Sequence, residues 1–115
     1  MLAYPITSME LSTYRDTQDI LLGPNPGRAA QWAVSVDRLV TATTPPMFIW
    51  HTAEDNYVHP EHSYRLAAAL SAAGRPHALH VFEHGPHSLG LAPAPSGLAV
   101  SRWTELAADW IAELL

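Results

Sequence analysis

The sequence predicts an α/β fold in which parallel strands alternate with helices. Residues 47–50 form a continuous apolar run that follows two prolines; it is too short for a helix and suits a strand covered on both faces. Residues 60–73 open on a proline, are rich in Ala and Leu, and end before Gly74, as expected of a helix. Residues 78–82 then predict a second strand. Two strands joined by such a helix form a right-handed crossover and are therefore parallel.

The segment before this unit predicts one more strand and two short helices. Residues 2–4 form an apolar run that ends at Pro5, and we expect a strand there that pairs with the strand at 47–50. A loop is expected at 7–13, followed by helices at 16–22 and 27–33 on either side of a Pro-Asn-Pro turn. Residues 35–44 are expected to form a connector whose apolar side chains pack into the core: Val36, Leu39 and Val40.

The segment after the second strand predicts a loop and a terminal helix. Residues 83–87 leave the strand as a loop, and Pro93, Pro95 and Gly97 mark another loop. A helix is expected from residue 99 to 114, because apolar residues recur there at three- and four-residue spacing and form a stripe that should pack on the sheet: Trp103, Leu106, Ala107, Trp110, Ile111 and Leu114.

Composition excludes several classes of function. The formal net charge is −5, there is no Lys, and the Arg residues are scattered, so we expect no nucleic-acid partner and no anionic membrane partner. The chain has no Cys, which excludes disulfides and thiol chemistry. No apolar run is long enough to span a membrane and no signal peptide is evident. We therefore predict a cytoplasmic protein.

Residues that could carry chemistry follow the ends of the two strands of the crossover unit. Asp55 comes just after the first strand and His87 lies in the loop after the second. Because the carboxyl ends of parallel strands meet at one edge of the sheet, these side chains should lie together where open α/β folds keep their active sites. Glu54 is a rival acid, but its position aims it differently.

These motifs resemble the C-terminal part of an α/β-hydrolase. HTAEDNYVHPEHS at 51–63 and GPHSLGLA at 85–92 are similar to the esterase family that includes acetyl-xylan esterases, feruloyl esterases and related lipase-like enzymes. LAYP at 2–5, DILLGPNP at 19–26 and TPPMFIWHT at 44–52 extend the resemblance. The sequence departs from the family's pattern at two positions. The acid-loop proline is displaced by one residue, to Pro60, and Ser88 stands where the family commonly has glycine.

The resemblance implies a fold and a set of roles. Residues 1–115 would be a partial α/β-hydrolase domain of about three parallel strands with flanking helices, without the front half that holds the nucleophile elbow and oxyanion hole. We expect a truncated gene model or a start codon placed inside a longer reading frame; the alternative is a natural stand-alone short protein. By resemblance, Asp55 and His87 are the acid and histidine of the triad, in the chain order that these enzymes use. The substrate would be a small acyl ester, including carbohydrate-linked esters, and no cofactor or metal is implied.

The nucleophile is absent from the sequence. There is no Gly-x-Ser-x-Gly motif, and none of the serines has the flanking glycines of an elbow. The main hypothesis is therefore a serine-dependent carboxylic-ester hydrolase whose serine lies outside this chain, with negligible esterase activity in the chain alone. The alternatives are a catalytically inactive binding fragment and a serine peptidase of the prolyl-oligopeptidase type. The strand at 2–4 would expose one unpaired edge, which predicts self-association.

The remaining histidines receive structural roles. His51, at the end of the first strand, is expected to support the acid loop. The others are expected at the surface or facing outward from strands: His59, His62, His77, His80 and His84. A metal site is a weaker alternative, because its possible ligands are dispersed and lack the regular spacing of zinc sites. They are His51, Asp55, His59 and His62, or His80, His84 and His87.

Overall fold

Three parallel strands form the centre of the molecule. The computed structural model describes residues 1–11, 15–92 and 98–115, and its strands are β1 (Leu2–Ala3), β2 (Met47–Thr52) and β3 (His77–Phe82). They lie in the order β1-β2-β3, with Leu2 opposite Ile49 and Met47 opposite His77. The predicted α/β class and the predicted pairing of the first strand with the second are confirmed. In the described part of the chain, β1 pairs on one side only.

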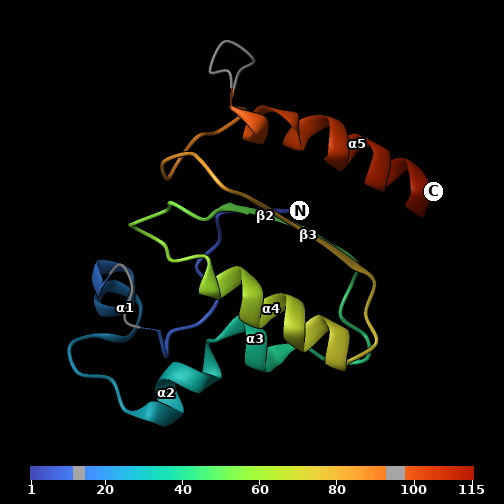
Figure 1. The fold of residues 1–115 in the computed structure, drawn as a ribbon. Helices are drawn as coiled ribbons and strands as arrows, with labels where there is room; N and C mark the ends of the chain where they lie inside the picture. The colour runs from blue at the N-terminus through green and yellow to red at the C-terminus, as the bar shows by residue number, and fades with distance from the viewer. Residues whose placement is uncertain (12–14, 93–97) are drawn as a thin grey trace.

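Helices cover both faces of the sheet. Helix α5 runs along one face, and α4 with α3 lies on the other (Figure 1). A 3₁₀ turn at Ala99–Arg102 leads into α5. The helices and their bounds are α1 (Arg15–Leu22), α2 (Arg28–Ala33), α3 (Val36–Leu39), α4 (Glu61–Ala72) and α5 (Trp103–Leu114).

The side chains of β2 point alternately to the two faces of the sheet and so divide the core into two halves. Phe48 and Trp50 are fully buried on the α5 side, where Trp50 stacks on Trp103 with ring centroids 5.2 Å apart. Ile49 points to the opposite side and packs with Leu66 and Leu70 of α4. This period of two is what a strand requires. It sets the face to which every later residue of β2 points.

The apolar stripe of α5 packs only in part. Its buried or half-buried members contact the cluster around Trp50: Trp103, Leu106, Ala107 and Trp110. Ile111 and Leu114, near the end of the helix, are 46% and 48% exposed. The stripe predicted from the sequence is therefore confirmed for the first two turns and wrong for the last.

Two further sequence predictions differ from the structure. The connector at 35–44 contains the short helix α3, and Val36 and Leu39 are exposed there, whereas Val40 packs against the α4-side core. The first strand of the crossover does not stop at Trp50 but continues through Thr52. The parts of the predicted loops at 12–14 and 93–97 lie outside the described residues.

A cluster of charged and aromatic side chains ties the loop after β1 to α2 and α3. Glu10 accepts hydrogen bonds from Trp32 Nε1 at 2.6 Å and from the Arg38 guanidinium, whose Nη2 lies 2.9 Å away. Arg38 also lies over the Trp32 ring, 4.2 Å from its centroid, a cation–π geometry. The Arg38 hydrogen bond, followed by that from Trp32, lowers the pKa of Glu10 to about 2. The cluster holds the β1 loop against the helical side.

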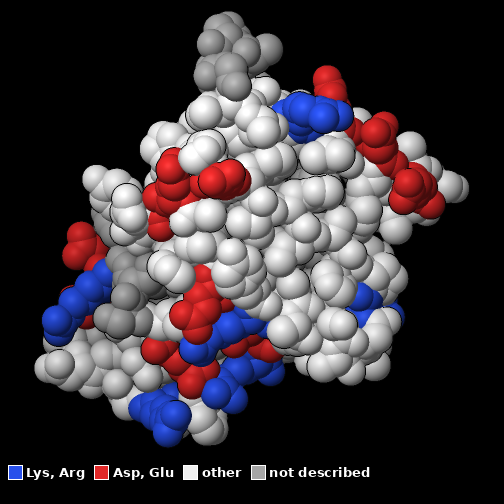
Figure 2. All heavy atoms as spheres, viewed as in Figure 1, with Lys and Arg blue, Asp and Glu red and all other residues white. Residues whose placement is uncertain are grey.

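Charges are confined to parts of the surface. On the face shown in Figure 2, a broad uncharged area lies between α5 and α4, where the strands are. Within the described residues, no helix combines the length and apolar character needed to cross a membrane.

Candidate active site

The acid loop is organised around the carboxylate of Asp55. β2 ends at Thr52, and the Asp55 Oδ1 atom accepts hydrogen bonds from the backbone N–H groups of Tyr57 at 3.0 Å and Val58 at 2.8 Å. This is the local turn that Asp side chains favour. Asp55 is only 2% exposed. One carboxylate oxygen is thus used by its own loop, and the other, Oδ2, points to the rest of the site.

His87 meets the second oxygen of Asp55. Its Nδ1 lies 2.6 Å from Asp55 Oδ2. Because an ionised carboxylate can only accept hydrogen bonds, Nδ1 is the donor. The imidazole lies between two aromatic rings, with Tyr4 edge-on at 4.9 Å and Tyr57 tilted at 6.1 Å between centroids. The structure therefore brings together both residues that the sequence singled out, from loops that follow neighbouring strands.

The histidine loop is fixed two residues before His87. Thr52 Oγ1 donates to the Gly85 carbonyl at 2.7 Å, and Glu54 Oε2 accepts from the Gly85 N–H at 3.1 Å. Gly85 has a φ of 139°, and a Cβ there would lie 2.8 Å from Leu89 Cδ1 and 3.0 Å from Thr52 Cγ2. Only glycine fits this conformation and this space without strain.

Glu54, the rival acid, takes a different role. Its Oε1 lies 3.0 Å from His84 Nδ1, and this hydrogen bond lowers the pKa of Glu54 and raises that of His84. Together with the contact to the Gly85 N–H, it holds the start of the histidine loop. Its described hydrogen bonds do not include His87.

His51 lies beneath the acid loop. It is fully buried; its Nε2 lies 2.7 Å from the Val58 carbonyl and 3.3 Å from Asp55 Oδ2, while its Nδ1 lies 2.7 Å from Ser63 Oγ. Burial lowers the pKa of His51, and this outweighs the opposing effects of Val58 and Asp55. These contacts agree with the structural role predicted from its place in the sequence.

His62 is not at the surface, and that prediction was wrong. It is fully buried, and its Nδ1 accepts hydrogen bonds from the backbone N–H groups of Thr7 and Ser8, both at 3.1 Å. Burial lowers its pKa to about 4, with smaller contributions from neighbouring groups. The signal that could have revealed it is its spacing to Leu66 and Leu70, which places all three on the inward face of one helix.

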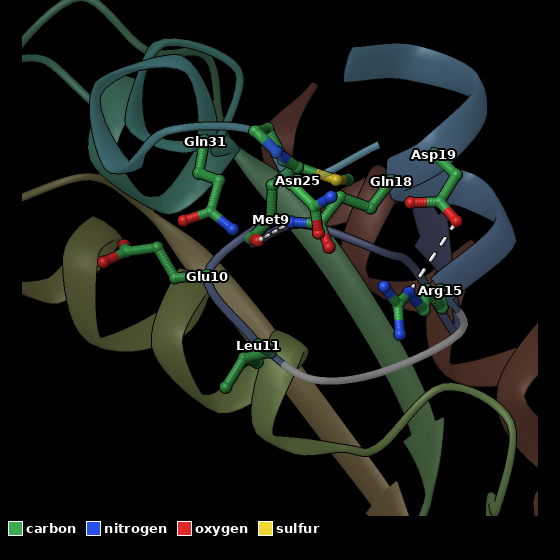
Figure 3. Close-up of a pocket in the computed structure, with 9 residues that line it drawn as sticks. Met9, Glu10, Leu11, Arg15, Gln18, Asp19, Asn25 and Gln31 are labelled. Carbon is green, nitrogen blue, oxygen red and sulfur yellow. Dashed lines mark hydrogen bonds and ion pairs between the residues drawn. The ribbon is translucent and has the colours of Figure 1, made fainter. Parts of the chain in front are cut away.

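A hollow of about 390 Å³ opens beside the start of the histidine loop and is lined by Glu54, Asn56, Gly85 and Pro86; two others lie near these elements. One, of about 450 Å³, lies beside the imidazole and is lined by Ile6, Thr17, Tyr57, Val58, His87 and Ser88. The other, of about 310 Å³, lies between the β1 loop, α1 and α2, and none of its lining residues belongs to the Asp55–His87 pair. Figure 3 shows this last hollow, with polar side chains such as Gln18, which donates to the Met9 carbonyl at 3.0 Å.

Metal binding has no support in the described residues. Within residues 1–11, 15–92 and 98–115, no cluster of three or more His, Cys, Asp or Glu side chains could hold an ion. The ligands of the alternative metal site separate: His51 and Asp55 contact each other, His62 turns to the β1 loop, and His59 is exposed.

A parallel sheet with an acid and a histidine on the loops after neighbouring strands defines the α/β-hydrolase class of proteins. The comparison with known families agrees: residues 1–115 match the model of the prolyl oligopeptidase family. The chain belongs to this family.

Individual relatives are hydrolases. The acetyl ester-xyloside bifunctional hydrolase from Caldicellulosiruptor lactoaceticus is 38% identical, with a TM-score of 0.91 over 98% of this chain and 41% of that one. A sugar hydrolase from Lactococcus lactis is 30% identical, with a TM-score of 0.77 over 98% of this chain and 47% of that one. Endo-1,4-beta-xylanase B from Butyrivibrio fibrisolvens is 39% identical over 92 residues, which are 80% of this chain and 14% of the xylanase. The chain thus spans less than half the length of each of these relatives.

Proposed function

We propose that the complete protein hydrolyses carboxylic esters, with Asp55 and His87 as the acid and histidine of a serine-dependent triad. The observation that carries this proposal is the 2.6 Å contact between Asp55 Oδ2 and His87 Nδ1 at the carboxyl edge of the sheet, beside a cavity of about 450 Å³. With Nδ1 donating to the carboxylate, a neutral His87 keeps its lone pair on Nε2. That atom is the one that a general base uses in this class of enzyme.

The reaction requires a hydroxyl that this chain does not supply in an elbow motif. In the proposed mechanism a serine from sequence outside residues 1–115 attacks the ester carbonyl, and His87 Nε2 takes the hydroxyl proton. His87 then gives this proton to the departing alcohol, leaving an acyl-serine. The same imidazole then takes a proton from a water molecule, which attacks the acyl-serine; the bond from the acyl carbon to the serine oxygen breaks, the imidazolium returns the proton to that oxygen, and the carboxylic acid is released. Asp55 holds the ring in the required tautomer and stabilises the imidazolium throughout.

The names of the relatives support a carbohydrate-linked acyl ester as the substrate. One is an acetyl ester-xyloside hydrolase, another is a sugar hydrolase, and a third is a xylanase. The cavity beside His87 has mixed polar and apolar walls, and Ile6, Thr17 and Tyr57 are among the residues that line it. Such a site can accommodate a small acyl group and part of a sugar.

An ester assay tests the proposal directly. A protein that includes the preceding sequence with its nucleophile should hydrolyse p-nitrophenyl acetate and bind a fluorophosphonate probe covalently. His87→Ala should abolish turnover, whereas His59→Ala, at an exposed histidine of the acid loop, should not. Residues 1–115 alone should show neither activity. Turnover by the 115-residue chain that depends on His87 would contradict the proposed division of the triad.

A serine peptidase is the second candidate, because the matching family is that of prolyl oligopeptidase. The same acid and histidine serve both reactions, and the chemistry differs in the leaving group, an amine instead of an alcohol. The two are separated by kcat/KM for an acetylated sugar and for a proline-containing peptide. We expect the ester to be the better substrate; a higher kcat/KM for the peptide would favour the second candidate.

A further inference from the structure

We propose that His51 is a positioning residue for the Asp55–His87 pair, and that Ser63 anchors the His51 imidazole in the orientation that this role needs. The proposal rests on the proposed function, because it assigns a task to a residue that does not itself reach the substrate. It describes a chain of contacts, Ser63–His51–Asp55–His87, which runs from α4 through the end of β2 to the histidine loop.

The hydrogen-bond partners determine the tautomer of His51. The Val58 carbonyl can only accept, so the Nε2 atom 2.7 Å away carries the hydrogen. A neutral ring then has its lone pair on Nδ1, and the Ser63 hydroxyl, 2.7 Å away, donates to it. Both ring nitrogens have partners in this arrangement. Rotating the ring, or moving its hydrogen from Nε2 to Nδ1, would leave the buried Val58 carbonyl without its donor, which is costly.

The same Nε2 hydrogen also lies near the acid. Asp55 Oδ2 lies 3.3 Å from His51 Nε2. This is the same carboxylate oxygen that accepts the hydrogen bond from His87 Nδ1. Both backbone groups of Val58 are held, since its N–H donates to Asp55 Oδ1 and its carbonyl accepts from His51 Nε2. The carboxylate therefore cannot swing toward or away from His87 without breaking contacts in the loop and with His51.

Burial makes these contacts hard to replace by water. His51 and Ser63 are fully buried and Asp55 is 2% exposed. Burial also lowers the pKa of His51, which favours the neutral ring that the contacts require. Ser63 lies on α4, so the position of the acid loop depends on a helix of the scaffold and not on another loop. Sites held by regular elements keep their geometry better than sites held by loops.

The experiment measures the His87 Nδ1 proton by NMR in the 115-residue chain, where no nucleophile is required. In the wild type, this proton should give a resonance far downfield of the amide region, protected from exchange by its hydrogen bond to Asp55. His51→Leu should abolish the resonance through fast exchange with water. His51→Gln, which keeps an N–H donor near the Nε2 position, should retain it.

Two further variants complete the test. His80→Leu, the same substitution on the neighbouring strand where His80 packs against Phe48, is the matched control and should retain the resonance. Ser63→Ala leaves the imidazole in place, so it tests the second half of the proposal even if His51→Leu does not fold. It should keep the hydrogen of His51 on Nε2, because the Val58 carbonyl still accepts it, but it should loosen the ring, so that the His87 resonance broadens through faster exchange with water.

A folded His51→Leu variant with an unchanged His87 resonance would overturn the positioning role. Ser63→Ala with a His87 resonance as narrow as that of the wild type would overturn the role of Ser63. Neither result depends on ester turnover. Failure of the proposed function would instead be seen as an intact resonance in a complete protein that hydrolyses no ester, so the two failures are distinguishable.

Discussion

The buried His62 should make the protein sensitive to acid. In the folded state its pKa is lowered from 6.5 to about 4, chiefly by burial. In the unfolded chain it returns to about 6.5. Between these values the unfolded state binds more protons than the folded state, so the free energy of unfolding falls as the pH falls. The contribution of His62 is complete above about pH 6.5 and is lost progressively down to about pH 4.

The size of the effect follows from the shift. Each pKa unit corresponds to about 1.4 kcal/mol, so the loss attributable to His62 approaches about 3 kcal/mol at pH 4. That is a large part of the roughly 5–15 kcal/mol that stabilises an ordinary domain. His51, whose pKa burial also lowers, acts in the same direction, so a variant is needed to isolate His62.

His62→Asn provides that isolation. An Asn side chain offers an oxygen near the position of Nδ1, which can accept from the N–H groups of Thr7 and Ser8, and it does not titrate in this range. Urea unfolding followed by circular dichroism, at about pH 7.5 and about pH 4, should show that the variant loses about 3 kcal/mol less than the wild type. His59→Asn, at an exposed position, should behave like the wild type. An unchanged pH dependence in His62→Asn would refute the reasoning.

Three substitutions and one property of the unchanged chain have defined outcomes. Asp55→Asn should preserve the fold but place an amide donor opposite His87 Nδ1, which imposes the wrong tautomer on His87. The kcat of the complete enzyme for an ester substrate should therefore fall by about 10⁴-fold. A loss below tenfold would contradict the triad. Gly85→Ala should destabilise the chain by about 1–3 kcal/mol through backbone strain alone, measured by denaturant unfolding; an unchanged midpoint would show that the loop relaxes. Trp103→Ala should cost about 3–5 kcal/mol, because it removes the stacking partner of Trp50 from the core; a cost below about 1 kcal/mol would mean that α5 does not hold the sheet. The open edge of β1 at Leu2–Ala3 should lead to self-association of the 115-residue chain in sedimentation, and a stable monomer with a cooperative melt would argue against it.

The parts of the site that could be predicted depend on local pattern. Asp55 and His87 follow apolar runs at short distances along the chain, and the parallel arrangement of their strands brings the two loops to one edge. Their juxtaposition was therefore predictable from the crossover unit alone. The three-strand order was predictable for the same reason, because the crossover and the apolar run near the N-terminus left few arrangements.

The parts that could not be predicted depend on distant hydrogen-bond partners. His51 and Thr52 looked like the start of a loop because polar residues are rarely buried in a central strand, yet their partners are Ser63 on α4 and the Gly85 carbonyl after β3. The sequence pattern places His62 at the surface because its partners, the backbone N–H groups of Thr7 and Ser8, lie 55 and 54 positions away along the chain. A buried polar group needs a hydrogen-bond partner. Where that partner is distant along the chain, local sequence patterns give no sign of it.

The end of β2 organises both loops of the proposed site, from opposite faces of the sheet. Thr52 points to the α5 side and binds the Gly85 carbonyl of the histidine loop, whereas His51 points to the α4 side and binds the Val58 carbonyl of the acid loop. The alternation of a strand makes this division unavoidable for adjacent residues. Because every described hydrogen bond that aligns Asp55 with His87 joins residues between 51 and 87, the pair can assemble before any nucleophile is present. A serine supplied by the rest of a longer protein would then meet an acid and an imidazole that are already in place.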